Sequence, residues 1–400
     1  MPHIIAREYK KIKTPAQRDG IEFLWFAEPL ANASETLVCA KHENIYFLLT
    51  IKRKNGNFII KSDKTTRPTP STIVKKALKS FCSLAECDVI YSNIANIKDR
   101  HLEEGSRFLK DIWFFAQNFP KDKEVWIEIG FGSGRHLLHQ ARQNPDILFI
   151  GLEIHKPSIE QVLKQIKIQK LDNLYVIDYD ARLFLEFVPS NLVGKIFVHF
   201  PVPWDKKPHR RVFSKRFIKE AKRVLKKNGI LELRTDSRNY FDYAMELFMD
   251  EPRIHLEVLK NIETVVRSKY EDRWRRMEKD IYEIRMINDE VSESLILKGS
   301  FDFEGGLNVR NIIKNFSNRP IKYDEYFIHF EKLYKISEDS ILIKLSFGAF
   351  DRPEHLYIII DAKGAKYFPR NPVLSRLNLK AHNKIKEMLY GKQSNSSTRS

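Results

Sequence analysis

Between residues 99 and 290, short runs of apolar residues alternate with longer segments of helical periodicity. Runs that are apolar throughout are typical of strands buried on both faces of a sheet. Helices between consecutive strands imply crossover connections and therefore parallel strands. The pattern predicts an α/β domain with a mostly parallel, doubly wound sheet. The predicted strands are 125–129, 148–153, 174–178, 195–200 and 230–234, and the helical segments include 134–143, 157–170 and 213–227.

The segments on either side of this domain read differently, because strand-like runs predominate in both. In the first, Asn55-Gly56 is a strong signal for a two-residue hairpin turn, and a basic helix is predicted near residues 74–81. We therefore expect strand-rich α+β modules at 1–98 and 291–390. The polar residues 391–400 are expected to be disordered.

The composition narrows the class of protein. The 400 residues carry a formal net charge of +17, which favours a polyanionic partner such as nucleic acid. Three cysteines fit neither a disulfide framework nor a four-ligand zinc site, and the twelve histidines show no ligand spacing, so no metal is expected. No apolar run approaches the roughly 18 to 20 residues of a membrane span, and the N-terminus does not read as a secretory signal. We expect a cytoplasmic protein.

A glycine-rich loop, EIGFGSG, follows the first predicted strand and begins at Glu128. Gly130, Gly132 and Gly134 allow the backbone to turn sharply and to approach a ligand. A dinucleotide fingerprint would need its third glycine at position 135, which is Arg135. A carboxylate beside the loop suits the cationic sulfonium of S-adenosylmethionine better than a pyrophosphate, which it would repel.

Two further acids follow the next strands. Glu153 ends the second predicted strand, where a carboxylate can accept from both hydroxyls of a ribose, and Asp180 follows the third, within reach of an adenine amino group. Either acid alone would more often be a solvated loop residue. Together with Glu128 they would meet at the carboxyl edge of the sheet, where open α/β folds bind ligands. These residues predict a donor-binding site.

The fourth predicted strand runs into a rigid turn, Pro201-Val202-Pro203, because prolines continue neither strand nor helix. Trp204 follows, either to stack on a base or to pack within the turn. Residues 205–227 then hold eleven Lys or Arg and two Asp or Glu, a net charge of +9. Such a segment is expected to contact phosphates. The side chains expected to do so are those of Lys207, Arg210 and Arg211.

Six segments match the order and spacing of the bacterial tRNA guanine-N7 methyltransferase family. They are EIGFGSG (128–134), FIGLEIHKP (149–157), DAR (180–182), FPVPWDKKPHRR (200–211), RTDSRNY (234–240) and SKYE (268–271). The chain resembles this family from about residue 110 to 290, and the flanks look like additions. The resemblance implies a class I (Rossmann-like) methyltransferase fold, S-adenosylmethionine as methyl donor, and N7 of a guanosine in the tRNA variable loop as acceptor.

The resemblance also implies roles for single residues. It assigns donor binding to Glu128, Glu153 and Asp180, and tRNA or guanine contact to Lys206, Asp236, Ser268, Lys269, Tyr270 and Glu271. The chain departs from the family at Val202, where an aspartate is usual, and Asp205 is the nearby acid that could replace it at the active site. Guanine N7 carries a free lone pair, so methyl transfer to it requires no general base.

Several alternatives remain open at this point. The domain could methylate another RNA or a protein, or it could be a non-catalytic RNA-binding protein with a decayed methyltransferase fold, for which Val202 is the best argument. Asp236 has two interpretations. Its carboxylate could accept from N1–H and the amino group of guanine, or it could cap the helix that begins near Ser237.

Overall fold

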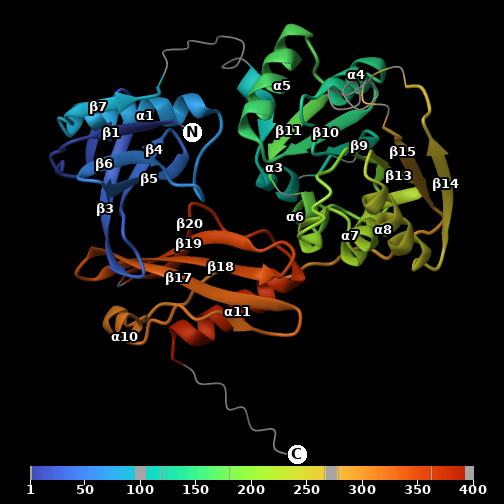
Figure 1. The fold of residues 1–400 in the computed structure, drawn as a ribbon. Coiled ribbons are helices and arrows are strands. Elements are labelled where there is room, and N and C mark those ends of the chain that lie inside the picture. The colour runs from blue at the N-terminus through green and yellow to red at the C-terminus, as the bar shows by residue number, and fades with distance from the viewer. Residues whose placement is uncertain are drawn as a thin grey trace, which may run out of the picture. The chain divides into compact units, whose positions relative to one another are not determined.

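The chain divides into two compact units, one formed by Met1–Ile97 together with Lys298–Ser400 and the other by Lys98–Leu297 (Figure 1). The computed structural model describes residues 2–94, 105–117, 119–120, 122–179, 181–264, 266, 277, 279–361 and 363–391. The predicted tail, 391–400, therefore lies outside the described residues except for Gly391. In the described part of the chain, no helix has both the length and the apolar character that crossing a membrane requires.

The unit 98–297 is built on an eight-stranded sheet in the order β14-β15-β13-β12-β9-β10-β11-β8. The strands from β8 to β13 pair in parallel, whereas β15 is antiparallel to both β13 and β14. The strands are β8 (Leu109–Lys110), β9 (Val125–Ile129), β10 (Leu148–Glu153), β11 (Leu174–Asp178), β12 (Val193–His199), β13 (Leu225–Thr235), β14 (Ile254–Lys260) and β15 (Tyr282–Asn288). The mostly parallel sheet agrees with the sequence prediction, and β9, β10 and β11 have the predicted bounds.

Helices cover both faces of this sheet (Figure 1). On one face, α4 and α5 pack Leu137 and Val162 against Trp126 and Phe197 of the sheet. On the other face, α7 and α8 pack against β13. The helices are η1 (Ser106–Phe108), α3 (Ile112–Gln117), α4 (Arg135–Gln143), α5 (Lys156–Ile168), α6 (Ala181–Leu185), η2 (Pro208–Arg210), α7 (Lys215–Val224) and α8 (Arg238–Met249).

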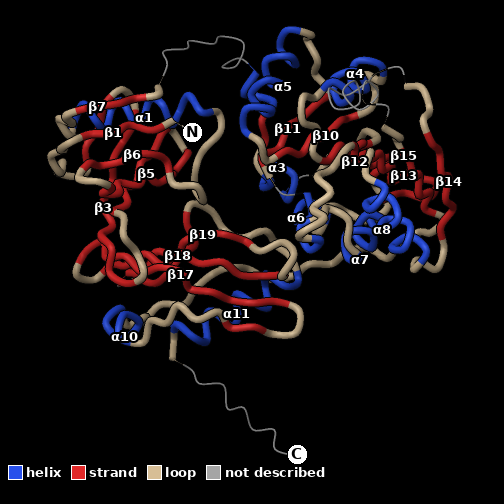
Figure 2. The backbone as a smooth tube through the Cα atoms, in the orientation of Figure 1, coloured by secondary structure: helices blue, strands red, loops and turns tan. Residues whose placement is uncertain are grey.

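The other unit is a strand-rich structure to which both ends of the chain contribute (Figure 2). Its sheet follows the path β20-β19-β18-β17-β3-β4-β5-β6-β1-β7, with β16 on β17 and β2 on β3. The strands are β1 (His3–Ala6), β2 (Ala16–Arg18), β3 (Ile21–Ala31), β4 (Thr36–His42), β5 (Ile45–Lys54), β6 (Asn57–Ser62), β7 (Val89–Ser92), β16 (Ile321–Lys322), β17 (Tyr326–Ser337), β18 (Ser340–Ala349), β19 (Glu354–Asp361) and β20 (Gly364–Phe368). The helices are α1 (Ser71–Leu84), α10 (Val309–Lys314) and α11 (Arg376–Leu389).

This arrangement differs from the two separate flanking modules that the sequence suggests. Strand β17 pairs antiparallel with β3, so that Leu333 lies opposite Ala31 and Lys335 opposite Glu28. The hairpin turn at Asn55-Gly56 is found as expected, between β5 and β6. Pairing between strands about 300 residues apart leaves no local pattern in the sequence, which is why the joined sheet was not anticipated.

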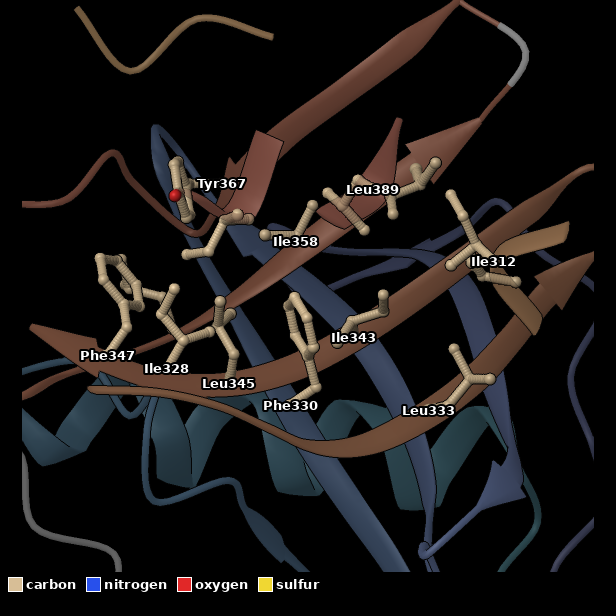
Figure 3. Packing of buried hydrophobic residues seen from close by; sticks show 14 of the residues in the cluster. Ile312, Ile328, Phe330, Leu333, Ile343, Leu345, Phe347, Ile358, Tyr367 and Leu389 are labelled. Atoms are coloured by element: carbon tan, nitrogen blue, oxygen red, sulfur yellow. The ribbon is translucent and has the colours of Figure 1, made fainter. Parts of the chain in front are cut away.

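Three apolar clusters stabilise this unit. One lies between α1 and strands β1 to β6 and includes Phe23, Phe47 and Phe81. A second packs α10 and α11 on β17 to β20 (Figure 3). The third joins strands from both ends of the chain, with Leu37 and Tyr334 among its buried residues. Burial of apolar area contributes about 25 cal/mol per Å², so these clusters hold the two chain ends in one unit.

Candidate active site at the carboxyl edge of the sheet

The glycine loop after β9 is left-handed at three positions, with φ of +69° at Gly130, +50° at Gly132 and +71° at Gly134. A Cβ at Gly134 would lie 2.2 Å from Val162 Cγ2, so this glycine is required by the packing of α5. At Gly132 the nearest atom would be a backbone oxygen 4.0 Å away, and at Gly130 nothing lies within 4 Å. Gly130 and Gly132 therefore border open space, as residues that admit a ligand must.

Glu153, at the end of β10, holds this loop in place. Its Oε2 accepts from the Gly132 N–H at 3.0 Å, and its Oε1 accepts from Ile154 and His155 N–H at 2.8 and 2.9 Å. Oε1 thereby uses both of its lone pairs, whereas Oε2 has one more, so the side chain can still accept from a ligand hydroxyl through Oε2. The expected donor residue thus has a second role that sequence reasoning did not assign.

Gly151, within β10, is also needed by the loop and was not singled out from the sequence. A Cβ there would lie 2.4 Å from Leu137 Cδ2 and 2.8 Å from Phe131 Cδ1. A glycine inside an otherwise apolar strand is the signal that could have found it, because such a glycine often marks a close backbone approach.

Glu128 is 4% exposed and pairs with a histidine that the sequence analysis did not consider. Its Oε2 lies 2.7 Å from His136 Nδ1, on the first turn of α4. The His136 ring lies 4.5 Å, centroid to centroid, from that of His199 at the end of β12. His199 Nε2 in turn lies 2.8 Å from Glu232 Oε1 on β13. Two carboxylates and two imidazoles thus form a continuous row beneath the loop.

The environment separates the protonation states of the two histidines. Burial lowers the pKa of His136, but the Glu128 carboxylate outweighs it, and the pKa is raised overall. Burial lowers the pKa of His199, and the neighbouring His136 lowers it further. Burial alone would raise the pKa of Glu232, yet the hydrogen bond from His199 and the nearby charges lower it to about 2. The row therefore favours a protonated His136 beside a neutral His199.

The row continues as ion pairs across β13 and β15. Arg285 lies 3.4 Å from Glu232 and 2.6 Å from Glu283, measured between nitrogen and oxygen. Arg234 lies 3.2 Å from Glu283. The register sets Glu232 opposite Arg285 and Arg234 opposite Glu283, so these two charges on β13 face opposite charges on β15. These partners could not be recognised from sequence, because β15 was not predicted.

The proline turn after β12 is held by Arg211, which was expected to contact phosphate. Arg211 is 8% exposed, its Nε donates to the Pro203 carbonyl at 2.7 Å, and its guanidinium lies 4.5 Å from the ring centre of Tyr243. Its Nη2 also lies 3.3 Å from Asp205 Oδ1. This position makes Arg211 an internal support of the turn. Asp205, the acid considered for catalysis, is half-exposed and forms one end of that support.

Most of the positive charge in residues 205–227 is neutralised within the unit. Seven of the eleven bases have an acidic partner within 4.0 Å: Arg211, Lys215, Arg216, Lys222, Arg223, Lys226 and Lys227. Among the residues that the structure describes, no such partner is found for Lys206, Lys207, Arg210 or Lys219. The Arg210 guanidinium lies 5.1 Å from the ring centre of Trp204, which is 37% exposed. The available charge is thus concentrated beside that indole.

Asp236 follows β13 at the same edge of the sheet. Its Oδ2 lies 3.2 Å from Lys279 Nζ, and the helix-capping role considered for it belongs to Ser237, whose side chain accepts from the Tyr240 N–H at 3.2 Å. The helix-cap interpretation of Asp236 is therefore wrong. The other expected site residues, Asp180 and Ser268, Lys269, Tyr270 and Glu271, lie outside the described residues.

Comparison with known proteins bears on the whole chain. A family model described as "Putative methyltransferase" matches residues 122–284. The tRNA (guanine-N(7)-)-methyltransferase of Wolinella succinogenes is 41% identical over 97% of this chain and 100% of its own length. The proteins of that name from Campylobacter fetus and Helicobacter hepaticus are 40% and 36% identical, over 97% of this chain and 99% of theirs.

The chain belongs to the tRNA (guanine-N(7)-)-methyltransferase family.

The similarity of this methyltransferase to its relatives is wider than the motifs suggested. The motifs span about 110–290, whereas the relatives match nearly the full length, so the flanking segments are shared with them. These segments form the strand-rich unit described above. They are a regular part of this form of the family rather than additions to a single protein.

Val202 occupies the position at which the family usually has an aspartate. Val202 is 60% exposed, on the turn between Pro201 and Pro203. Asp205 is three residues further on, and its carboxylate is tied to Arg211 rather than free to replace an acid at position 202. The geometry therefore does not favour Asp205 as the replacement for an acid at position 202.

Proposed function

We propose that this methyltransferase transfers the methyl group of S-adenosylmethionine to N7 of a guanine in tRNA, in the variable loop, and that residues 98–297 form a class I (Rossmann-like) methyltransferase fold. The observation that carries the proposal is the 41% identity, over 97% of the chain, to a protein named tRNA (guanine-N(7)-)-methyltransferase. The antiparallel β15 between β13 and β14, at the end of an otherwise parallel sheet, supports the fold assignment.

The loop after β9 suits the donor. Side chains are absent where Gly130 and Gly132 border open space, and Oε2 of Glu153 can still accept from a ribose hydroxyl. Bound S-adenosylmethionine would supply an electrophilic methyl group on a cationic sulfur. Glu128 supports the donor site indirectly, because its carboxylate is hydrogen-bonded to His136. Asp180 stays the proposed contact for the adenine.

On the acceptor side, Asp236 is the residue proposed to select guanine. Its carboxylate can accept from N1–H and the amino group of guanine, a pair of donors that adenine lacks. Lys279 Nζ lies 3.2 Å from this carboxylate. Lys206 and the segment 268–271 are proposed to contact the tRNA. N7 attacks through its own lone pair, so the residues need only align the base and exclude water.

The proposal is tested by incubating the protein with methyl-labelled donor and bulk tRNA and then mapping the modified nucleotide. We expect label only in tRNA, as N7-methylguanosine in the variable loop. Label in protein or in another RNA would support the other methyltransferase substrates instead. Donor binding without any transfer would support a non-catalytic RNA-binding protein.

A matched pair of glycine variants tests the donor site. Gly132→Val should abolish donor binding in calorimetry, because a branched side chain would enter the space next to the loop. Gly306→Val is the control, since Gly306 also has positive φ and open space around it but lies in the other unit. Equal donor affinity in the two variants would contradict the loop assignment.

A further inference from the structure

A second, longer stretch of the chain carries nearly as much net positive charge as the one that follows the proline turn. Residues 44–85 hold nine Lys or Arg and a single acid, Asp63, a net charge of +8. Asp63 is buried, and its Oδ2 accepts from the Thr65 and Thr66 N–H groups at 2.8 and 3.0 Å. Asp63 is therefore engaged by the backbone of its own loop.

Three of these bases share one face of the sheet. Lys52 and Lys54 lie on β5, and the register sets Lys61 of β6 opposite Thr50, so the three side chains fall on the same side of the pleat. The other side carries Ile51 and Ile60, which pack beneath α1. In the described part of the chain, Lys52, Lys54 and Lys61 have no acidic partner.

The same face continues onto β1 and β7. His3 of β1 lies opposite Lys61, and Tyr91 of β7 lies opposite Ile5, two residues further along β1. Tyr91 is 50% exposed, and its ring centre lies 5.6 Å from that of His3. Exposed aromatic rings beside lysines are the combination on which unpaired bases stack while the phosphates are neutralised.

Protection of a sheet edge does not account for these lysines. Charged side chains on an edge strand discourage pairing with another molecule. Strands β5 and β6, however, are interior strands, each paired on both sides. The basic stretch 205–227 of the other unit meanwhile offers few available bases. Among the described residues, only four of its eleven bases lack an acidic partner: Lys206, Lys207, Arg210 and Lys219. A long polyanionic substrate needs more contacts than these.

We infer that the face formed by Lys52, Lys54, Lys61 and Tyr91 is an RNA-binding surface that contacts the phosphates and an unpaired base of the tRNA substrate. The inference rests on the proposed function for the identity of the RNA. The face supplies affinity without base selection, because lysine–phosphate contacts carry no sequence information.

The test compares two triple variants that remove the same charge from the same unit. Lys52→Ala, Lys54→Ala and Lys61→Ala remove the face, whereas Lys314→Ala, Lys322→Ala and Lys363→Ala remove three exposed lysines elsewhere. Binding of tRNA transcript is measured over a series of KCl concentrations. The face variant should lose on the order of 10- to 100-fold in affinity near physiological salt, and its salt slope should fall by about 2. The control variant should stay close to wild type in both.

Tyr91→Ala should weaken tRNA binding by about 5- to 100-fold while leaving the salt slope unchanged, because stacking releases no counterions. Equal behaviour of the two triple variants, or competition by polyglutamate as strong as that by tRNA, would overturn the inference. Melting temperatures of all variants verify the fold. Methyl transfer by the wild type is scored separately. If the wild type methylates tRNA but the face variant binds tRNA normally, only the inferred RNA-binding surface is overturned. If the wild type does not methylate tRNA, only the proposed function is overturned.

Discussion

The two basic stretches of this protein carry nearly equal charge in opposite surroundings. Residues 205–227 have a net charge of +9, and residues 44–85 have +8. In the first stretch seven of the eleven bases are paired with acids, five of them with acids outside the stretch, for example Lys226 with Glu124 and Lys215 with Asp250. In the second, the lysines on the face formed by Lys52, Lys54, Lys61 and Tyr91 have no acidic partner in the described part of the chain. Charge counted along a sequence thus does not tell how much charge is available to a partner.

The difference has a physical origin in the elements that carry the bases. Helix α7 packs against β13 and the neighbouring helices, so its long side chains reach acids on several elements. Lys222 is buried between Glu251 and Glu290, at 3.1 and 3.4 Å. Strands β5 and β6 instead project alternate side chains away from the core, and in the described part of the chain no acid forms an ion pair with Lys52, Lys54 or Lys61 there. Bases of the first kind stabilise the fold, and bases of the second kind are available to RNA.

The largest effect is expected from replacing the Asp236 carboxylate, which is proposed to accept hydrogen bonds from guanine. Asp236→Asn should lower methyl transfer by about 10²- to 10⁴-fold, because a guanine in the site would lose its paired acceptor. Its tRNA affinity, salt slope and melting temperature should stay near wild type, which would separate base selection from phosphate binding. Ser237→Ala is the control. It should lower stability by about 1 kcal/mol through loss of the α8 cap and leave transfer largely intact. Normal transfer by a folded Asp236→Asn variant would remove Asp236 from the site.

The contrast between structural and available bases predicts a large difference in stability. Lys222→Met should reduce the free energy of unfolding by about 3 kcal/mol, because Glu251 and Glu290 would lose their shared partner. Lys52→Met should change it by less than about 0.5 kcal/mol, since Lys52 is exposed. Denaturant unfolding of both variants measures the difference. Equal free energies would show that the ion pairs of α7 do not stabilise the unit.

A smaller effect is expected from the exposed bases next to Trp204. Replacing Lys206, Lys207 and Arg210 by Ala should weaken tRNA binding by about tenfold or more and lower the salt slope. The matched control replaces Lys215, Lys226 and Lys227 by Ala. It removes the same charge, but from lysines that are paired with acids. That control should alter the slope less. If the two variants weaken binding equally, net charge rather than availability governs RNA binding.

The smallest expected effect concerns the buried histidine row. The pKa of His136 is raised by Glu128, so protonation of His136 favours the folded state. Its contribution is complete below the unfolded value near 6.5 and is lost as the pH rises through the higher folded pKa. The stability advantage of wild type over His136→Gln should therefore shrink as the pH rises above about 6.5.

His139→Gln is the control for this prediction. His139 lies on the same helix, and its pKa is lowered by burial and by Arg142, so its charged form does not favour folding. No advantage of wild type over this variant should develop at low pH. A pH-independent difference between wild type and His136→Gln would show that His136 is not charged beside Glu128.

Much of the sheet could be predicted from the sequence. The strands at 125–129, 148–153 and 174–178, the glycine loop between Glu128 and Gly134, and the hairpin at Asn55-Gly56 were all anticipated. Each is specified by residues close together in the chain, through apolar runs, the conformational freedom of glycine and turn chemistry. The position of Glu153 at the carboxyl edge follows from the same patterns.

The tertiary structure alone decided which of the polar residues were engaged. It buried Arg211 against Pro203 and Tyr243, brought His136 to Glu128, and joined β3 to β17. It also paired most bases of α7 with acids, and among the described residues it left Lys52, Lys54 and Lys61 without an acidic partner. The reason is that periodicity and turn propensity act over a few residues, whereas hydrogen bonds and ion pairs depend on distances between segments that only the packed chain brings together.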